Sequence, residues 1–445
     1  MCHYSNREDV HLADGLKAQQ IVQAGKQGRA LMSNLMEIVC SPTNIWTSYK
    51  QVKQNKGSSG IDGMSVQEFS VWYRANGQAL ITTLKSGTYE PSPVRLVEIP
   101  KPNGGTRQLG IPTVIDRVIQ QAIHQVLSPI YEREFSNSSY GFRPHRSAID
   151  ALRKSSEYVT SGRTTVVDID LKTFFDLVNH DRLMYRLSTR IGDKSLLQLI
   201  RKYLQSGIMT DGVISQRTEG TPQGSPLSPL LSNIVLDELD KELERRGHCF
   251  VRYADDCNIF VRSQEAGERV MQSISNFITH KLKLQVNEEK SKVCAVGKSK
   301  FLGYTITESG DLIINPTSIE RLKAKIRAIT RRNRGIKFEQ IITELNPTLR
   351  GWLNYFRHAR CYKHVQTLDA WIRRKLRCYR LKQCKRVYTL QQFLHRQGVA
   401  KWQSWILALS GKGLWRKSGC PQSCQSMGNE WFLKLGLYNL TLNYA

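Results

Sequence analysis

Two short apolar runs in the middle of the chain lie on either side of a pair of carboxylates. The runs are Cys249–Tyr253 and Cys257–Val261, and Ala254-Asp255-Asp256 joins them. Strand-like runs with so short a connection predict a β-hairpin with an acidic tip. Neighbouring carboxylates at a tight turn raise one another's pKa, and Mg²⁺, which prefers oxygen ligands, would neutralise them. Solvated turn residues are the alternative, since aspartate is common in turns.

A second apolar stretch also carries acids. Residues 164–171 are mostly β-branched or apolar, as in a buried central strand, yet Asp168 and Asp170 share one face of it. Buried acids need a metal or a charged partner. Two acidic strands predict a two-metal site for in-line displacement at phosphorus, and an ion-pair network is the alternative that the residues leave open. Asn179 is then expected to cap a helix around Leu183–Leu187.

Two segments have the composition of loops. Pro102–Gly105 is a turn between two β-like runs, and Lys101 and Arg107 flank it, so two cations could meet a triphosphate there. A solvated pair of charges is the alternative. Gly220–Pro229 is too rich in Gly, Pro and Ser for regular structure, and such a loop lets the backbone approach a ligand closely. A helix follows, with an apolar face made of Leu231, Ile234, Val235, Leu239 and Leu243.

After Pro316 the pattern of apolar positions becomes helical. Three apolar groups occur at helical spacing: Ile319, Leu322, Ile326 and Ile329; Phe338, Ile341, Ile342 and Leu345; and Trp352, Leu353, Tyr355 and Phe356. These groups predict a helical C-terminal region after a catalytic region of mixed strands and helices.

The net charge is concentrated in this same region. The whole chain has 65 Lys and Arg residues against 38 Asp and Glu, a formal charge of +27. Residues 317–445 have 26 basic and 5 acidic residues, or +21, and they contain six of the eight tryptophans. An excess of this kind predicts a polyanionic partner, and interleaved aromatic side chains suit stacking on unpaired bases. Some of the tryptophans are expected in the core.

The motifs occur in an order that resembles the reverse transcriptases encoded by group II introns. The resemblance covers nearly the whole chain. It rests on Val97–Arg107, Leu109–Arg117, Ser139–Pro144, Asp168–Asp176, Gly220–Pro229, Tyr253–Asp256, Asn287–Lys290 and Phe301–Tyr304. Two further stretches, Leu349–Arg357 and Trp371–Arg380, resemble the family's maturase region.

The resemblance implies an α+β fold. It is the right-hand polymerase fold with fingers and palm, followed by a helical thumb and a basic, mostly helical maturase domain. The expected boundaries are an N-terminal extension at 1–79, fingers and palm at 80–315, the start of the thumb at 316–345, and the thumb end with the maturase (X) domain at 346–445.

The implied function is that of an RNA-directed DNA polymerase and maturase, which binds group II intron RNA, assists its splicing and copies it into DNA during retrohoming. Two alternatives remain. One is a reverse transcriptase of a defence or diversity-generating system, against which Leu349–Arg357 argues. The other is an RNA-binding splicing factor without polymerase activity, against which the intact acids at 170, 255 and 256 argue.

The resemblance also implies roles for individual residues. Asp170, Asp255 and Asp256 are the expected catalytic residues and the ligands of two Mg²⁺ ions, with Asp168 as a candidate supporting residue. By resemblance, Phe175 takes the place of an aromatic residue that lies beneath the incoming sugar, and a ring at that place excludes a 2′-hydroxyl. The periodicity of the sequence alone instead predicts that at least one of Phe174 and Phe175 is a core residue. The expected nucleotide-binding residues are Lys101, Arg107, Phe175, Gln223, Gly224 and Lys290.

Intron recognition is expected in the basic C-terminal region. The residues implied are Arg350, Trp352, Arg357, Arg373, Arg374, Lys375, Arg377 and Arg380. The implied partners are group II intron RNA, an RNA template with a DNA primer, target DNA and deoxynucleoside triphosphates. Self-association as a homodimer is left open.

The remaining features concern the cellular compartment of the protein. No apolar run is long enough to span a membrane, and the N-terminus is too polar for a signal peptide, which predicts the bacterial cytosol or nucleoid. The ten cysteines show no framework pattern, as expected for reduced thiols. Cys420 and Cys424 are a close pair without a second liganding pair nearby, so zinc is not expected. By resemblance, the chain is expected to lack the second-strand nickase that the family often carries.

Overall fold

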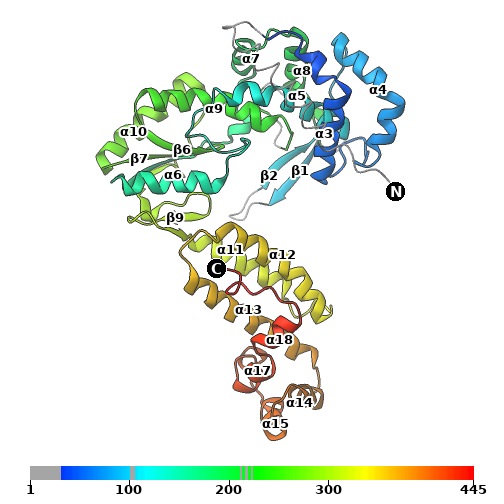
Figure 1. The fold of residues 1–445 in the computed structure, drawn as a ribbon, viewed down its shortest axis with the longest axis vertical. Helices are drawn as coiled ribbons and strands as arrows, with labels where there is room; N and C mark the ends of the chain where they lie inside the picture. The colour runs from blue at the N-terminus through cyan, green and yellow to red at the C-terminus, as the bar shows by residue number, and fades with distance from the viewer. Residues whose placement is uncertain (1–31, 101–105, 211–212, 216–218, 222–223, 445) are drawn as a thin grey trace, which may run out of the picture. The chain divides into compact units, whose positions relative to one another are not determined.

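The fold is described by a computed structural model, which covers residues 32–100, 106–210, 213–215, 219–221 and 224–444 (Figure 1). The chain divides into two compact units. One comprises residues 1–151 and 167–293, and the other comprises residues 152–166 and 294–445.

Helices and a small sheet form one part of the first unit. The helices are α2 (Leu35–Val39), α3 (Pro42–Gln54), α4 (Phe69–Ser86), α5 (Val114–Glu132) and α8 (Lys194–Gln205). Helix α3 packs against α5, and Ser41 caps α3 in front of a proline at its first position. The sheet has the order β2-β1-β4-β5, from β1 (Val94–Pro100), β2 (Thr106–Ile111), β4 (Ile208–Thr210) and β5 (Val213–Ser215).

Strands β1 and β2 pair antiparallel, with Pro100 opposite Thr106. The expected hairpin is therefore confirmed. Its tip, which includes Lys101 and the turn at 102–105, lies outside the described residues.

A second sheet has the order β6-β7-β3-β8. Its strands are β3 (Thr165–Ile169), β6 (Cys249–Tyr253), β7 (Asp256–Val261) and β8 (Lys292–Ala295). Strand β3 lies between β7 and β8, and four of its five residues are buried, so the predicted buried central strand is confirmed. Helix α9 (Ser228–Arg245) contacts β6, and α10 (Gln264–Phe277) contacts β7 (Figure 1).

Shorter elements connect these parts. They are α6 (Ala148–Thr160), the 3₁₀ turn η1 (Phe174–Asp176), α7 (His180–Ser188), the π-helical turn η2 (Ile278–Leu282) and the 3₁₀ turn η3 (Val296–Lys298). Asn179 caps α7 by accepting a hydrogen bond from the Arg182 backbone N–H at 2.9 Å, as the sequence predicts.

The C-terminal region is helical, as predicted. A short hairpin of β9 (Tyr304–Ile306) and β10 (Leu312–Ile314) precedes α11 (Pro316–Ile329), α12 (Phe338–Phe356) and α13 (Tyr362–Gln383). The shorter helices are α14 (Val387–Arg396), α15 (Lys401–Leu409), α16 (Leu414–Lys417), α17 (Pro421–Ser426) and α18 (Asn429–Lys434). Within this unit, α14, α15 and α17 gather at the end opposite β9 and α11 (Figure 1).

Buried leucine, isoleucine and phenylalanine side chains hold α11 and α12 together. The second and third predicted apolar groups lie on the single helix α12, which continues through Pro347. The boundary expected between residues 345 and 346 therefore falls inside a continuous helix. The buried Asp369 of α13 accepts hydrogen bonds from the backbone N–H groups of Leu440 and Thr441, which fixes the last turns of the chain to α13.

Candidate active site

The acidic hairpin forms where the sequence predicts it. Strands β6 and β7 pair antiparallel, and Tyr253 lies opposite Asp256, so Ala254 and Asp255 make a two-residue turn. Ala254 has a φ of 59°, in the left-handed region that a non-glycine residue adopts only where its surroundings hold it. Asp255 is exposed at the tip.

A buried arginine holds this turn. Arg252 is fully buried, and its guanidinium donates to both carboxylate oxygens of Asp240, with 2.7 Å from Nε to Oδ1. It also donates to the Ala254 carbonyl oxygen at 2.9 Å, to Asn233 Oδ1 at 2.9 Å and to Ser139 Oγ at 2.8 Å. A guanidinium with five fixed donors suits such a network. The backbone next to Asp255 is thus tied to α9 and to the segment around Ser139.

Gly141 lies in close contact with the backbone of the same turn. A Cβ atom at this position would lie 2.3 Å from the Ala254 backbone nitrogen, closer than any real contact. The Gly141 carbonyl oxygen accepts a hydrogen bond from Asn233 Nδ2 at 2.9 Å, so the glycine belongs to the network that holds Arg252. The motif at 139–144 therefore has a structural reason, because only glycine allows this approach to the hairpin.

Strand β3 brings the other acids to the neighbouring strand. Asp168 lies within it, and Asp170 follows its last residue. Burial raises the pKa of Asp168 to about 6; Lys292 opposes the shift, and the charge of Asp170 adds to it. Burial also raises the pKa of the Cys257 thiol on β7, and among the charges that contribute are Asp256 and Asp168. The Asp168 carboxylate of β3 thus lies close enough to β7 to act on a side chain of that strand.

Residues 285–291 surround Asp170. Its backbone N–H donates to Ser291 Oγ at 3.0 Å, and its carbonyl oxygen accepts from the Asn287 backbone N–H at 2.8 Å. Lys290 Nζ lies 3.7 Å from Asp170 Oδ1, and both side chains are exposed. The segment Asn287–Lys290, expected from its place in the motif order, is therefore next to the expected catalytic residue.

The donor set fits a hard divalent cation. Asp170, Asp255 and Asp256 offer only carboxylate oxygens, which suit Mg²⁺ and not a thiophilic metal. Within the described parts of the chain, no group of three or more His, Cys, Asp or Glu residues is arranged to hold a metal ion.

The glycine-rich loop lies against the segment that follows β3. The Thr221 backbone N–H donates to the Phe175 carbonyl oxygen at 2.6 Å, and Gly220 lies against the backbone of Asp176. Phe174 is buried in the core, as expected for one of the two rings, and its ring meets Phe175 edge to face at 5.3 Å. Phe175 is only partly buried.

The same loop also meets the β1–β2 hairpin. Gly224 has a φ of 107°, and a Cβ there would lie 2.8 Å from Leu109 Cδ1 on β2. This places Gly224 beside the strand that contains Arg107. Lys101 and Gln223 lie outside the described residues, as does the side chain of Arg107. Among the expected nucleotide-binding residues, Gly224 therefore lies beside β2, the Phe175 carbonyl oxygen is hydrogen-bonded to the glycine-rich loop, and Lys290 lies next to Asp170.

The expected RNA-binding cations differ in their surroundings. Arg350 and Arg357 on and after α12 are exposed, with the Arg350 guanidinium 5.3 Å from the Tyr438 ring. Trp352 is half-buried against Phe356 at 5.1 Å between ring centroids, and its buried Nε1 has no hydrogen-bond partner among the described residues.

The five expected RNA-binding cations of α13 are half-buried, and four of them contact their own unit. Arg374 stacks on Trp415 at 4.2 Å, and Lys375 lies over the same ring at 5.0 Å. Arg377 donates to the Ser418 carbonyl oxygen at 3.1 Å and to Cys424 Sγ at 2.9 Å, and Arg380 lies over Phe393 at 4.7 Å. Arg373 is half-buried on the same helix. These side chains hold α13 to the segments after it, a role that a charge count does not reveal.

Two families match the chain in succession. Residues 99–306 match the family described as reverse transcriptase (RNA-dependent DNA polymerase). Residues 319–398 match the maturase-specific domain of group II introns.

Curated relatives extend the match. Protein YkfC of Escherichia coli is 31% identical over 62% of this chain and 83% of its own length. The chain belongs to the group II intron reverse transcriptase and maturase family. The group II intron-encoded protein LtrA of Lactococcus lactis is 32% identical over 62% of this chain, but the match spans only 57% of LtrA. A putative COX1/OXI3 intron 1 protein of Saccharomyces cerevisiae is 26% identical over 67% of this chain and 42% of its length.

Membership of this family confirms the α+β polymerase fold and the activity of an RNA-directed DNA polymerase with a role in intron splicing and mobility. Reverse transcriptase domains work with divalent metal ions on a nucleic-acid template, and a maturase domain implies RNA binding. No helix of the described chain is long and apolar enough to cross a membrane.

The sequence does not predict the roles of two residues in and beside the acidic hairpin. Arg252 lies in β6 and hydrogen-bonds to the Ala254 carbonyl oxygen of the acidic turn, and Gly141 lies against the backbone of the same turn. In the sequence, Arg252 stands in an otherwise apolar strand, where a charge needs a buried partner, and Gly141 lies in the motif at 139–144.

Proposed function

We propose that the chain copies group II intron RNA into DNA from a primer end at target DNA, and that its C-terminal unit binds the intron and assists its splicing. Both DNA synthesis and intron splicing would take place in the bacterial cytosol or nucleoid. The observation that carries the proposal is the sheet order, because β3 and β7 are neighbours, Asp170 directly follows β3 and Asp256 begins β7. The maturase match beyond residue 306 favours this function over a defence or diversity-generating reverse transcriptase.

Asp170, Asp255 and Asp256 would hold two Mg²⁺ ions. When bound, such ions activate a primer 3′-hydroxyl and stabilise the charge of a leaving pyrophosphate. The protein's own residues set the geometry. Arg252 and Gly141 fix the backbone beside Asp255, and the contacts of Asp170 with Asn287 and Ser291 fix the end of β3.

A deoxynucleoside triphosphate would lie between the glycine-rich loop and the β1–β2 hairpin. Gly224 offers backbone close to β2, Lys101 and Arg107 would supply charge for the phosphates, and Gln223 would be a further nucleotide-binding residue. Lys290, already next to Asp170, would contribute a further cation.

Primer extension tests the function directly. With an RNA template, a DNA primer and Mg²⁺, the purified chain should add deoxynucleotides, and it should promote splicing of the intron encoded around its own gene at low Mg²⁺. If the chain promoted splicing but did not extend the primer, it would be an RNA-binding splicing factor without polymerase activity. Extension without any effect on splicing would leave a reverse transcriptase of another system.

Phe175 is the proposed gate against ribonucleotides. The Phe175→Val enzyme should incorporate ribonucleotides at least about tenfold more readily, because the missing ring leaves room for a 2′-hydroxyl. Single-nucleotide incorporation with deoxy and ribo substrates measures the ratio. Phe174→Val is the matched control, since it removes a neighbouring core ring and should lower stability without changing the ratio. An unchanged ratio in Phe175→Val would make Phe175 a packing residue.

Intron binding should depend on the exposed cations of α12. Replacing Arg350 and Arg357 together by glutamine should weaken intron binding and reduce its log–log salt dependence by up to about 0.7–0.9 for each phosphate that the protein no longer neutralises. Filter binding across a salt series measures both. Arg245→Gln with Arg269→Gln removes the same charge from exposed positions on α9 and α10 and should leave the slope unchanged. Equal slopes in both double variants would place the intron-binding cations elsewhere.

A further inference from the structure

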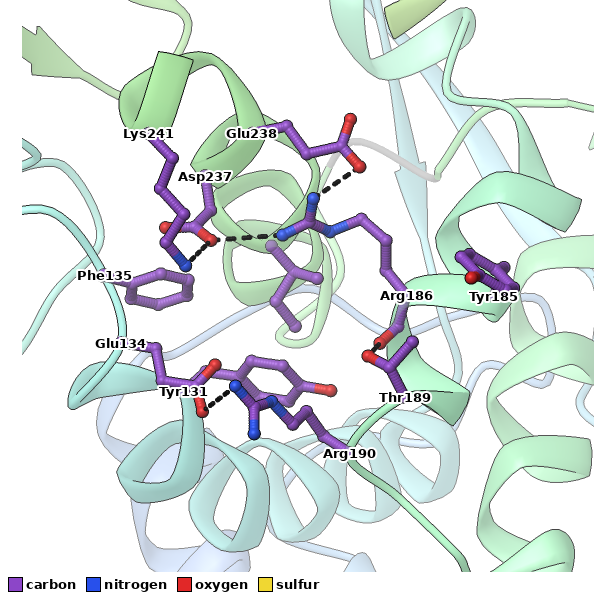
Figure 2. A pocket seen from close by; sticks show the side chains of 11 residues that line it. Tyr131, Glu134, Phe135, Tyr185, Arg186, Thr189, Arg190, Asp237, Glu238 and Lys241 are labelled. Atoms are coloured by element: carbon purple, nitrogen blue, oxygen red, sulfur yellow. Dashed lines mark hydrogen bonds and ion pairs between the residues drawn. The ribbon is translucent and has the colours of Figure 1, made fainter. Parts of the chain in front are cut away.

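A cavity of about 240 Å³ opens between the end of α5, helix α7 and helix α9 of the first unit (Figure 2). None of the residues that line it belongs to the candidate active site. Its walls are mostly charged and aromatic side chains, and α9 packs against both α5 and α7 around it.

Two polar atoms of residues that line the cavity lack the hydrogen bonds that buried groups normally make. Asp237 Oδ1 and the Tyr131 hydroxyl are buried, and neither has a hydrogen-bond partner among the described residues. The two residues are only 3% and 5% exposed. Because an unpaired buried polar group is costly, a bound molecule with a donor and an acceptor would stabilise this wall.

The charges of the cavity disfavour an anionic occupant. Arg186 lies between Asp237, at 3.1 Å, and Glu238, at 2.6 Å, and Lys241 is 2.6 Å from Asp237 Oδ2 (Figure 2). Arg190 is likewise paired with a glutamate at 2.8 Å. Each cation is already held by a carboxylate, so a phosphate would meet as much negative as positive charge. A neutral group fits better.

The aromatic side chains suit a flat occupant. Tyr131 and Phe135 stack with 6.3 Å between ring centroids, and Tyr185 is 71% exposed at the rim. Burial raises the pKa of Tyr131, with Glu134 adding to the shift, so the hydroxyl stays protonated and can donate. The edge of every nucleobase presents donors and acceptors, and its face stacks on aromatic rings. The volume, on the order of eight water molecules, suits a single base.

We propose that this cavity binds one unpaired nucleobase of the strand that the protein engages, with Tyr185 against the face of the base and Tyr131 and Asp237 hydrogen-bonded to its edge. The proposal rests on the proposed function in one respect, that the chain binds single-stranded nucleic acid. Tyr185 is exposed at the rim, so a base stacked on it can enter the cavity while its sugar and phosphates stay in solvent, away from the paired charges of the wall.

Photocross-linking tests the site. A short oligoribonucleotide containing 4-thiouridine, single-stranded or annealed to its complement, is irradiated with the full-length protein, and the cross-linked peptides are mapped by mass spectrometry. The single strand should cross-link to the peptides around Tyr131 and Tyr185, and the duplex should not. The corresponding oligodeoxynucleotide with 4-thiothymidine shows whether the base comes from RNA, DNA or both.

Tyr131→Phe removes only the unpartnered hydroxyl. Because that hydroxyl makes no hydrogen bond within the described chain, its loss should not lower stability, but it should reduce the cross-link about threefold to tenfold. Tyr49→Phe is the matched control, since the Tyr49 hydroxyl on α3 is equally buried and unpartnered within the described chain and does not line the cavity. Tyr185→Leu should weaken binding of the single strand, measured by fluorescence anisotropy, about fivefold or more while duplex binding is retained.

The outcomes separate the two proposals. Cross-links at other peptides only, or cavity cross-links that Tyr131→Phe and Tyr49→Phe leave equally strong, would overturn the nucleobase site while the polymerase function stands. If the protein binds no single strand in either assay, the proposed function itself is wrong.

Discussion

Asp170→Asn and Asp255→Asn should each reduce DNA synthesis by several orders of magnitude while intron RNA remains bound. Asparagine keeps the volume of the side chain but removes the charge, so the proposed Mg²⁺ ions would lose a ligand that their chemistry requires. Primer extension on an RNA template measures the rate, and filter binding measures intron affinity. The basic surface expected to bind RNA does not include either acid.

Asp181→Asn is the control for this pair. Asp181 is a largely exposed carboxylate on α7, paired with Arg201, and it belongs to the same unit without lying on β3 or the acidic hairpin. Its replacement should leave extension near the wild-type rate. Extension near that rate in Asp170→Asn or Asp255→Asn would refute the assignment of the catalytic carboxylates.

Gly141→Ala should reduce DNA synthesis by about a hundredfold, although the change adds only a single methyl group. The new Cβ would lie 2.3 Å from the Ala254 nitrogen, so the acidic turn must move. The contact is with backbone, which cannot rotate away as a side chain could. Single-turnover extension at saturating nucleotide isolates the chemical step from binding.

Gly297→Ala provides the comparison, because a Cβ at that position meets nothing within 4 Å and its φ is not in the left-handed region. It should behave like the wild type. If Gly141→Ala extends primers at the wild-type rate and remains equally stable, the hairpin tolerates displacement, and the network around Arg252 serves folding alone.

The sequence predicts the strands and the helix cap around the site, but it does not predict the long-range contacts that hold them in place. The hairpin at 249–261, the buried strand at 165–169 and the cap at Asn179 follow from local patterns of apolar, acidic and capping residues, and all three are present. Arg252 and Gly141 could not be assigned in this way. Their roles depend on contacts with residues about a hundred positions away, such as Ser139 and Ala254, which no local pattern encodes.

The cations of α13 show that the number of charges in a segment does not reveal what each charge contacts. The sequence places five of them within ten residues, Trp371–Arg380, which indicates a polyanion-binding surface. The structure places Arg374 on the Trp415 ring and Arg377 against Ser418, so part of this charge stabilises the unit internally. A count of arginines cannot distinguish a stacked guanidinium from a solvated one, because both have the same sequence signal.

The contacts of Asp170 have a consequence for synthesis of the protein on the ribosome. Its backbone is hydrogen-bonded to Asn287 and Ser291, the latter 121 residues later in the chain, and Arg252 in turn needs Ser139, 113 residues earlier. A nascent chain that has not yet released Ser291 from the exit tunnel therefore cannot complete the end of β3. Polymerase activity would begin only after most of the first unit has emerged, and truncated translation products that stop before Ser291 would lack both the completed end of β3 and the basic C-terminal unit.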